Sequence, residues 1–347
     1  MGTHAGYAEA CPEREDSNAG SAWLSMLAYF VREIVCSPVR FFRVLTRIVT
    51  IGPAQTSAFG LLRIRALARF VYANPKFLFK HLPPKYLIRD LPAQTRTACF
   101  VHHYRRLHAA LSERLFERLL REDVPLYQLC EGEHRYAVSM GRARSVKGTR
   151  QVDHEGEMSL NVLVDDTKVF VLSYTIVPGW VIEAPDAEVL VITRIQGSLG
   201  VFDQISQLSK AMHGIPPEML LITALQGVSE AFGIKTMAGV SAERHLCYEL
   251  EDDALFRRAY DDLFTKIGAV KNATGFFVAT LPLAEKSLAQ VKRGKSRARA
   301  RRALKLQVAE SACGCLRGQR PTIEERNPLA EVAGGDCGEP VVELSSH

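Results

Sequence analysis

The chain has 347 residues, of which 47% are hydrophobic and 24% are charged, and its formal net charge is +6. This length and composition predict a globular protein with one large core or two smaller ones. The charge favours anionic partners only weakly. The eight cysteines include no C-x-x-C pair, which argues against a zinc ribbon, and the chain is long for a disulfide framework. We therefore expect reduced thiols in a cytoplasmic protein.

The N-terminal region predicts helices rather than a targeting segment. Residues 1–20 are small and polar, with acidic residues where a secretory signal needs positive charge, and we expect them to be disordered. The apolar stretch at 22–30 is too short to span a bilayer. Residues 21–70 read as amphipathic helices, one with a basic face of Arg40, Arg43 and Arg47. That face either lies on an anionic membrane surface, peripheral to the inner membrane, or is the solvated side of a helix packed on the main domain.

A linker and a long helix follow. Residues 75–92 read as a linker with short apolar anchors, and residues 94–122 as one helix. His103 lies on that helix. It is either a general base or ligand in a cleft, or a residue that caps the edge of the core with its polar atoms hydrogen-bonded.

From about residue 125 the spacing of apolar residues changes from a helical to a strand-like pattern. Strands are predicted at 136–140, 158–164 and 169–176, with a short hairpin turn after the second of them. Glu155 and Glu157 flank Gly156 just before the second strand. Two carboxylates around a glycine suit acid–base chemistry or metal binding, and the alternative is an exposed strand entry with a glycine bulge.

Residues 188–240 contain the strongest pattern in the chain. An apolar strand at 189–195 is followed by a helix after Pro216 and a strand at 235–240, which is a βαβ unit with two parallel strands. Polar residues follow both strands, and the carboxyl ends of parallel strands meet at one edge of the sheet, where ligands tend to bind. Arg194 and Gln196 close the first strand, which stops at Gln196-Gly197, and Ser241 and His245 follow the second. Arg194 would hold an anionic group there, or would pair with an acid such as Asp203 or Glu243.

The last part of the domain is predicted as a helix at 252–267 and a strand at 275–281, followed by a cluster of cations. The cluster suits an anionic surface, although it lacks the aromatic residues of single-strand nucleic-acid binders. From about residue 310 the chain is poor in core residues, and Cys313 and Cys315 are too few for a structural metal site. The predicted organisation is therefore disorder at 1–20, helices at 21–70, one α/β domain at 71–308 and a disordered tail at 309–347.

Short segments spread over residues 70–308 resemble the bacterial VirK/YbjX family. They are His103-Tyr104, Glu155-Gly-Glu157, Ile195-Gln-Gly197, Lys210-Ala-Met-His-Gly214, Ala238-Gly-Val-Ser241, Tyr260-Asp261 and the basic stretch 292–302. The resemblance implies a Gram-negative bacterial protein linked to virulence, or to survival of envelope damage or cationic antimicrobial peptides. It carries no established reaction.

The predicted fold class is α/β (α+β): a mixed sheet in which an antiparallel meander is followed by βαβαβ, the element order of GNAT acetyltransferases. Three functions remain open. They are a non-catalytic accessory protein of the envelope-stress type, a GNAT-like enzyme that uses acyl-CoA, and a peripheral binder of anionic membranes.

The candidate residues fall into three groups. Those for catalysis are His103, Glu155, Glu157 and His245. Those for ligand binding are Arg194, Gln196, Gly197, Lys210, His213 and Ser241. Those for an anionic surface are Arg297, Arg299, Arg301 and Arg302. We expect no metal site and no nucleic-acid partner; a small-molecule ligand is compatible with the pattern, and cofactor and oligomeric state are left open.

Overall fold

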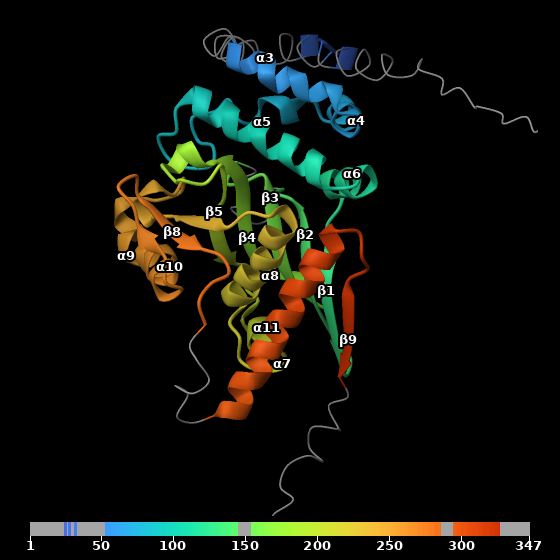
Figure 1. The fold of residues 1–347 in the computed structure, drawn as a ribbon, viewed down its shortest axis with the longest axis vertical. Helices are drawn as coiled ribbons and strands as arrows, with labels where there is room; N and C mark the ends of the chain where they lie inside the picture. The colour runs from blue at the N-terminus through green and yellow to red at the C-terminus, as the bar shows by residue number, and fades with distance from the viewer. Residues whose placement is uncertain are drawn as a thin grey trace, which may run out of the picture.

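A computed structural model describes residues 53–144, 154–285 and 294–326, together with 24–25, 27–28 and 31–32. Its strands form one mixed sheet with the order β7-β8-β6-β5-β4-β3-β2-β1-β9 (Figure 1). The strands are β1 (Val124–Glu131), β2 (His134–Arg142), β3 (Met158–Val164), β4 (Thr167–Pro178), β5 (Glu188–Gly197), β6 (Thr236–Val240), β7 (Val270–Lys271), β8 (Phe276–Thr280) and β9 (Thr322–Arg326). The predicted fold class is confirmed.

Strands β2 to β5 form the predicted antiparallel meander, and β1, for which no strand was predicted, extends it by pairing with β2. Between β3 and β4 the turn is made by Asp165 and Asp166, which both have positive φ (48° and 66°). This backbone matches the right-handed twist of a two-residue hairpin, and aspartate tolerates it better than most residues do.

Strands β5 and β6 are parallel neighbours, as predicted, but they pair over a short length. Residues 190–192 of β5 pair with residues 237–239 of β6, and β5 then continues to Gly197 without β6. Next to the last paired row, β5 has a bulge, because Arg194 pairs with Ser173 and Ile192 pairs with Tyr174. A bulge bends its strand and changes the direction of neighbouring side chains. The carboxyl ends of the two parallel strands therefore diverge beside Arg194.

Helices cover the sheet in layers. α8 and α11 lie side by side over one face, α5 contacts β4, α6 contacts β2, and α3 and α4 stack on α5 and α6 (Figure 1). The helices are α3 (Pro53–Phe59), α4 (Arg65–Ala73), α5 (Ala93–Ala110), α6 (Glu113–Arg121), α7 (Phe202–Ala211), α8 (Pro217–Phe232), α9 (Asp253–Phe256), α10 (Asp262–Lys266) and α11 (Lys295–Leu316). A π-helical turn, Arg257–Asp261, joins α9 to α10, so the helix predicted at 252–267 is present with a change of pitch.

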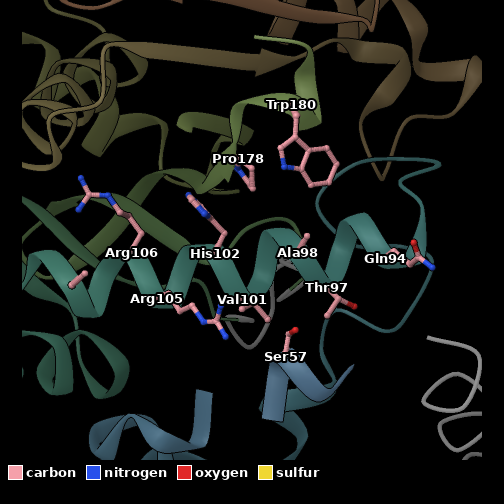
Figure 2. A pocket seen from close by; sticks show the side chains of 11 residues that line it. Ser57, Gln94, Thr97, Ala98, Val101, His102, Arg105, Arg106, Pro178 and Trp180 are labelled. Carbon is pink, nitrogen blue, oxygen red and sulfur yellow. The ribbon is translucent and has the colours of Figure 1, made fainter. Parts of the chain in front are cut away.

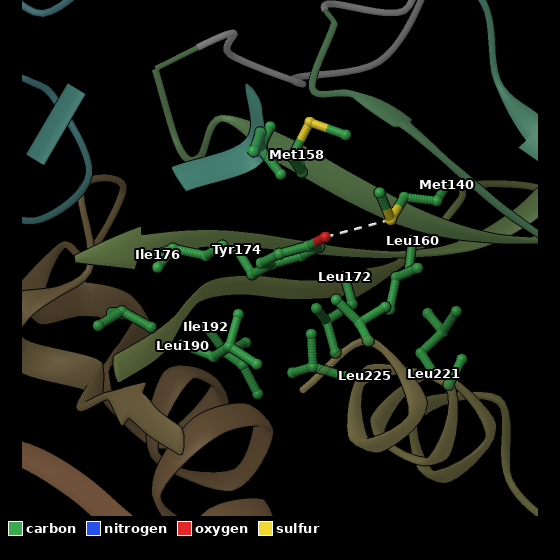
Figure 3. Packing of buried hydrophobic residues seen from close by; sticks show 14 of the residues in the cluster. Met140, Met158, Leu160, Leu172, Tyr174, Ile176, Leu190, Ile192, Leu221 and Leu225 are labelled. Atoms are coloured by element: carbon green, nitrogen blue, oxygen red, sulfur yellow. Dashed lines mark hydrogen bonds between the residues drawn. The ribbon is translucent and has the colours of Figure 1, made fainter. Parts of the chain in front are cut away.

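The centre of the core lies between the meander and α8. Leu221 and Leu225 of α8 point toward Leu172 of β4, beside Tyr174, whose hydroxyl donates to the sulfur of Met140 at 3.2 Å (Figure 3). These side chains are all buried. The apolar face of α8 that the sequence predicts is thus the face that packs on the sheet.

Two predictions in the first half of the chain were wrong. Residues 75–92 are not a linker, because Phe77, Leu82 and Tyr86 are buried in the core. The helix predicted at 94–122 breaks at Leu111, whose backbone is extended. Ser112 then caps α6 by accepting from the N–H of Leu115 at 3.4 Å, so the capping signal of a serine outweighs the continuous apolar period.

The tail predicted at 309–347 begins too early. α11 continues to Leu316 with Cys313 and Cys315 buried, and β9 pairs in parallel with β1. Both elements depend on partners far away in the sequence, so the local composition did not reveal them. The calls for residues 1–20, for the basic face of Arg40, Arg43 and Arg47, and for residues 327–347 lie outside the described residues.

Residues 53–70, the end of the region predicted as amphipathic helices, form α3 and most of α4, and Leu61 and Leu67 there are buried. Within the described ranges, no helix is both long enough and apolar enough to cross a membrane.

Candidate functional site

The two predicted carboxylates, Glu155 and Glu157, lie on a short segment that leads into β3. Gly156 between them is required by a close approach, since a Cβ there would lie 2.9 Å from the Cβ of Ser173 on β4. The segment is fixed on both sides. Thr193 of β5 donates to the carbonyl of Glu155, and the N–H of Glu157 donates to the carbonyl of Tyr174 at 3.2 Å. The segment is therefore a buried seam on the sheet, not the exposed strand entry.

Glu157 is fully buried and has several partners. Its two carboxylate oxygens accept from the hydroxyls of Tyr86 and Tyr104, each at 2.6 Å. The ammonium group of Lys80 lies 3.0 Å from the same carboxylate and also donates to the carbonyl of Gly156. Burial, and then the charge of Glu157, raises the pKa of Tyr86 well above its usual value. This arrangement ties α5 and the 80–86 segment to the sheet.

Glu155 has a different set of neighbours. Arg194 places a guanidinium nitrogen 3.1 Å from its Oε2, and the thiol of Cys247 donates to Oε1 at 3.1 Å. Nε2 of His245 lies 4.0 Å from the same oxygen. Burial raises the pKa of Glu155, and this effect exceeds the opposing ones of Arg194 and Cys247. A buried carboxyl with a raised pKa is suited to accepting and returning a proton.

His245 is buried as a neutral ring. Its Nδ1 accepts the backbone N–H of Cys247 at 3.1 Å, so the neutral ring carries its proton on Nε2, which lies 2.9 Å from the hydroxyl of Tyr260. Burial, with Arg194 and Arg89 nearby, lowers the pKa of His245 to about 3. A ring with so low a pKa stays neutral at neutral pH.

Cys247 is the solvent-facing member of this group. The residue is exposed, whereas Glu155, Arg194 and His245 are each less than 10% exposed. Burial of the sulfur, and then its hydrogen bond to Glu155, raises the pKa of Cys247 to about 11, so the thiol holds its proton at neutral pH. We call Glu155, Arg194, His245, Cys247 and Tyr260 the Glu155 cluster. It lies where β5 and β6 diverge, and Cys247 is its contact with solvent.

The structure brings some of the other predicted residues to this edge. Gln196 accepts from Arg194 at 3.0 Å, so Arg194 pairs with Glu155 and Gln196 and not with Asp203 or Glu243. Gly197 ends β5 beside the ring of Phe170. Ser241 is buried in the loop after β6.

His103 belongs to the surroundings of Glu157. It is buried next to Tyr104, and its Nδ1 accepts the N–H of Ile176 at 3.0 Å. Burial lowers its pKa well below the usual value. His103 therefore lies in the core with Nδ1 hydrogen-bonded, while its buried Nε2 has no hydrogen-bond partner among the described residues.

Lys210 and His213 are at the carboxyl end of α7, where the neighbour is α11. The carbonyl of His213 accepts from Arg301 at 2.8 Å and from Arg297 at 3.2 Å. These are two of the four cations predicted for an anionic surface, and they cap α7 instead of projecting freely.

The other two cations of that set differ from each other. Arg302 pairs with Glu285 at 2.8 Å, while Arg299 is exposed.

A separate pocket of about 530 Å³ lies along the outer face of α5 (Figure 2). Residues from α3, α5 and the segment after β4 line it: Ser57, Gln94, Thr97, Ala98, Val101, His102, Arg105, Arg106, Ala109, Pro178 and Trp180. Arg106 and His102 are bound to Glu188 at 2.7 and 3.3 Å. The pocket includes no member of the Glu155 cluster.

Sequence reasoning did not select Lys80, Tyr86 or Cys247 for the site. Lys80 and Tyr86 lie in the segment that was read as a linker, where no periodicity gives a signal. Cys247 stands two residues after a predicted site residue, and a His-x-Cys pair at the end of a strand was the only available signal.

A family model described as a protein of unknown function (DUF535) matches residues 44–311. The chain belongs to the DUF535 family. The match contains Glu157, its partners and the whole Glu155 cluster, and it also takes in residues 44–70, which the sequence had placed outside the domain. Searches among curated proteins and among solved structures return no significant match.

Proposed function

We propose that this DUF535 protein is of the VirK/YbjX type, acts as an accessory protein in bacterial envelope stress, and works through the Glu155 cluster. One observation carries the proposal. Segments on which the resemblance rests are far apart in sequence, yet they meet around Glu155 and Glu157. Tyr104 bonds to Glu157, and Tyr260 bonds to His245, which lies beside Glu155.

The chemistry of the cluster supports a binding role for an anionic or proton-donating ligand. Arg194 is 6% exposed, and its Nε is without a hydrogen-bond partner in the described part of the chain. A buried cation of this kind is costly to keep unless its donors are used. A ligand that enters beside Cys247 and brings an acceptor oxygen would accept from Nε of Arg194, the donor left over from the contacts with Glu155 and Gln196.

The test is made in cells. A strain that lacks the protein is complemented with the full chain or with Arg194→Ala, and survival of a cationic antimicrobial peptide is compared. We expect Arg194→Ala to lose protection while the purified variant remains folded, because the variant removes the anion-binding group at this edge. Arg118→Ala is the matched control, since Arg118 forms an exposed ion pair with Glu122. Full protection by Arg194→Ala would refute the role of the cluster.

A second candidate, acyl transfer from acyl-CoA, is favoured by the turn after β5. Helix α7 begins at Phe202, two residues after Gly200, whose φ is +75°. A glycine turn that leads into a helix N-terminus offers backbone N–H groups to a phosphate. This turn follows Gly197, the last residue of β5, and Glu155, which lies beside Arg194 of the same strand, would take the proton of the attacking amine or hydroxyl. Asp203 in the first turn of α7 already occupies part of the favourable field for an anion.

Calorimetry with acetyl-CoA and with a long-chain acyl-CoA tests the second candidate. We expect saturable binding that Gly200→Val weakens, since a β-branched residue does not tolerate this φ. Gly233→Val, at another positive-φ glycine in open surroundings, is the control. An absence of heat with both thioesters would remove acyl transfer from consideration.

A further inference from the structure

Three side chains of the Glu155 cluster form a ligand set for a metal ion. Glu155 and His245 are buried and Cys247 is exposed, and one ligand atom from each lies within 4.8 Å of the other two. They come from two segments, the seam before β3 and the loop after β6. We propose that these three residues bind one divalent transition-metal ion of the zinc type and leave its fourth coordination position open.

The distances suit such an ion. Zinc bonds of about 2.0 Å to nitrogen or oxygen and 2.3 Å to sulfur place tetrahedral ligand atoms about 3.3–3.7 Å apart. Sγ of Cys247 and Oε1 of Glu155 are 3.1 Å apart, and Nε2 of His245 is 4.0 Å from that oxygen. The observed separations lie on either side of the required ones. The third separation, between a ring nitrogen of His245 and Sγ of Cys247, is within 4.8 Å.

The donor set indicates which metals fit. One nitrogen, one sulfur and one oxygen donor exclude a hard-ion site of the calcium or magnesium type, which is built from oxygen atoms. Three protein ligands with an open fourth position is the arrangement of reactive zinc sites rather than of closed structural ones. The missing C-x-x-C motif, which led us to expect no metal, concerns only the closed kind.

The charges around the three ligands favour an anion at the open coordination position. A thiolate and a carboxylate balance a divalent cation, and the guanidinium of Arg194 then adds one positive charge at 3.1 Å from Glu155. Oε2 of Glu155 and Nε of Arg194 are buried and have no aligned hydrogen bond in the described part of the chain. The fourth ligand would therefore be an anion such as hydroxide, carboxylate or phosphate.

Metal binding would rearrange the hydrogen bonds of the cluster in a defined way. The Cys247 thiol would release its proton to solvent when the thiolate binds the ion. Ligation through Nε2 of His245, the nitrogen that faces Oε1 of Glu155, would change both hydrogen bonds of the ring. Nε2 would leave the hydroxyl of Tyr260, and Nδ1 would take the ring proton and no longer accept the N–H of Cys247. The exposure of Cys247 provides the entry path.

The inference goes beyond the proposed function, because neither the accessory role nor acyl transfer requires a metal. It also competes with the second candidate, since a metal-bound Glu155 is no longer available as a base. The failures of the two proposals can be told apart. Arg194→Ala retains all three ligands, so it would still bind metal even where protection in cells is lost.

The experiment titrates chelator-treated, reduced full-length protein with Co²⁺ and then displaces Co²⁺ with Zn²⁺. We expect one equivalent of Co²⁺ to give a thiolate charge-transfer band in the near ultraviolet and intense visible bands of a four-coordinate site. Cys247→Ser should abolish the charge-transfer band. Cys130→Ser, which changes a half-buried cysteine on β1, should leave it unchanged.

A second variant covers the case in which Cys247→Ser does not fold. Glu155→Gln keeps the shape of the side chain and should weaken Co²⁺ binding by at least about tenfold, as loss of a ligand does. The absence of a Co²⁺ band in the wild-type chain would overturn the proposal. So would a band of equal strength in Cys247→Ser, or unchanged affinity in Glu155→Gln.

Discussion

Glu155 and Glu157 are two residues apart and both are buried, yet different groups surround their carboxylates. Glu157 has a lysine and two tyrosine hydroxyls within 3.0 Å, and both of its oxygens accept aligned hydrogen bonds. Glu155 has an arginine, a neutral histidine and a thiol, and its Oε2 lacks an aligned hydrogen bond among the described residues. Residues two apart on a regular strand point to the same side of the sheet, so the separation of the two side chains comes from the bends at Glu155 and Glu157 before β3 begins.

The difference separates a structural site from a reactive one. A buried carboxylate with all its partners in place holds elements together and has little capacity for a further ligand. A buried carboxylate with an open oxygen, a raised pKa and an exposed neighbour retains that capacity.

Glu157→Gln should destabilise the protein by about 3–5 kcal/mol, because it leaves Lys80 buried without its counter-charge. Urea unfolding followed by circular dichroism measures the change. Glu122→Gln, which breaks an exposed ion pair with Arg118, should cost no more than about 1 kcal/mol.

The double variant Lys80→Met/Glu157→Gln should recover part of the loss, since it removes the uncompensated charge. If Glu157→Gln were no more costly than its exposed control, the assignment of Glu157 to a structural role would be wrong.

Acidification should weaken the region around Glu157 through His81. This ring is buried against Phe100, and burial, followed by the charges of Arg96 and Lys80, lowers its pKa to about 3. The unfolded chain takes up a proton below about pH 6.5 and the folded chain does not, so stability falls as pH decreases from 6.5 toward 3. Between pH 7 and pH 5 this one histidine should cost about 2 kcal/mol.

Thermal or urea unfolding of wild type and His81→Phe at both pH values measures that effect. The phenyl ring retains the stacking on Phe100 but does not titrate, so the variant should lose less stability on acidification. Parallel losses in the two proteins would contradict the burial of His81 as a neutral ring.

Glu155→Gln also removes the counter-charge of a buried cation, Arg194, but it should cost only about 1–2 kcal/mol. The cost is smaller because burial already raises the pKa of Glu155 and because Arg194 keeps its bond to Gln196. The cost should also shrink as pH rises. Burial raises the folded pKa of Glu155, so ionisation above its ordinary value penalises the wild type and not the variant. A loss as large as that of Glu157→Gln would remove the distinction between the two carboxylates.

The regular elements were predictable where the local pattern suffices. The meander, β5, α8 and β6 follow from the apolar period and from glycine and proline at the ends, as the confirmed strand at 158–164 and the helix after Pro216 show. The wrong predictions concern segments whose structure depends on contacts with residues far away in the sequence. Residues 75–92 belong to the core because Phe77 packs on Phe100 and Tyr104. Residues 322–326 form the strand β9 because they pair with the edge strand β1.

For the site, the sequence by itself determined that polar residues follow two neighbouring parallel strands, and it selected Glu155, Arg194 and His245 individually. It did not determine their grouping. Glu155 meets Cys247 across 92 positions, through the bulge in β5, the divergence of β5 from β6 and the turn at Tyr260. Local propensity acts over a few residues, whereas burial and hydrogen bonding act between whatever the chain topology brings together. Only the tertiary structure therefore decided that both carboxylate oxygens of Glu157 accept hydrogen bonds. It also decided that Oε2 of Glu155 pairs with Arg194 but has no aligned hydrogen bond among the described residues.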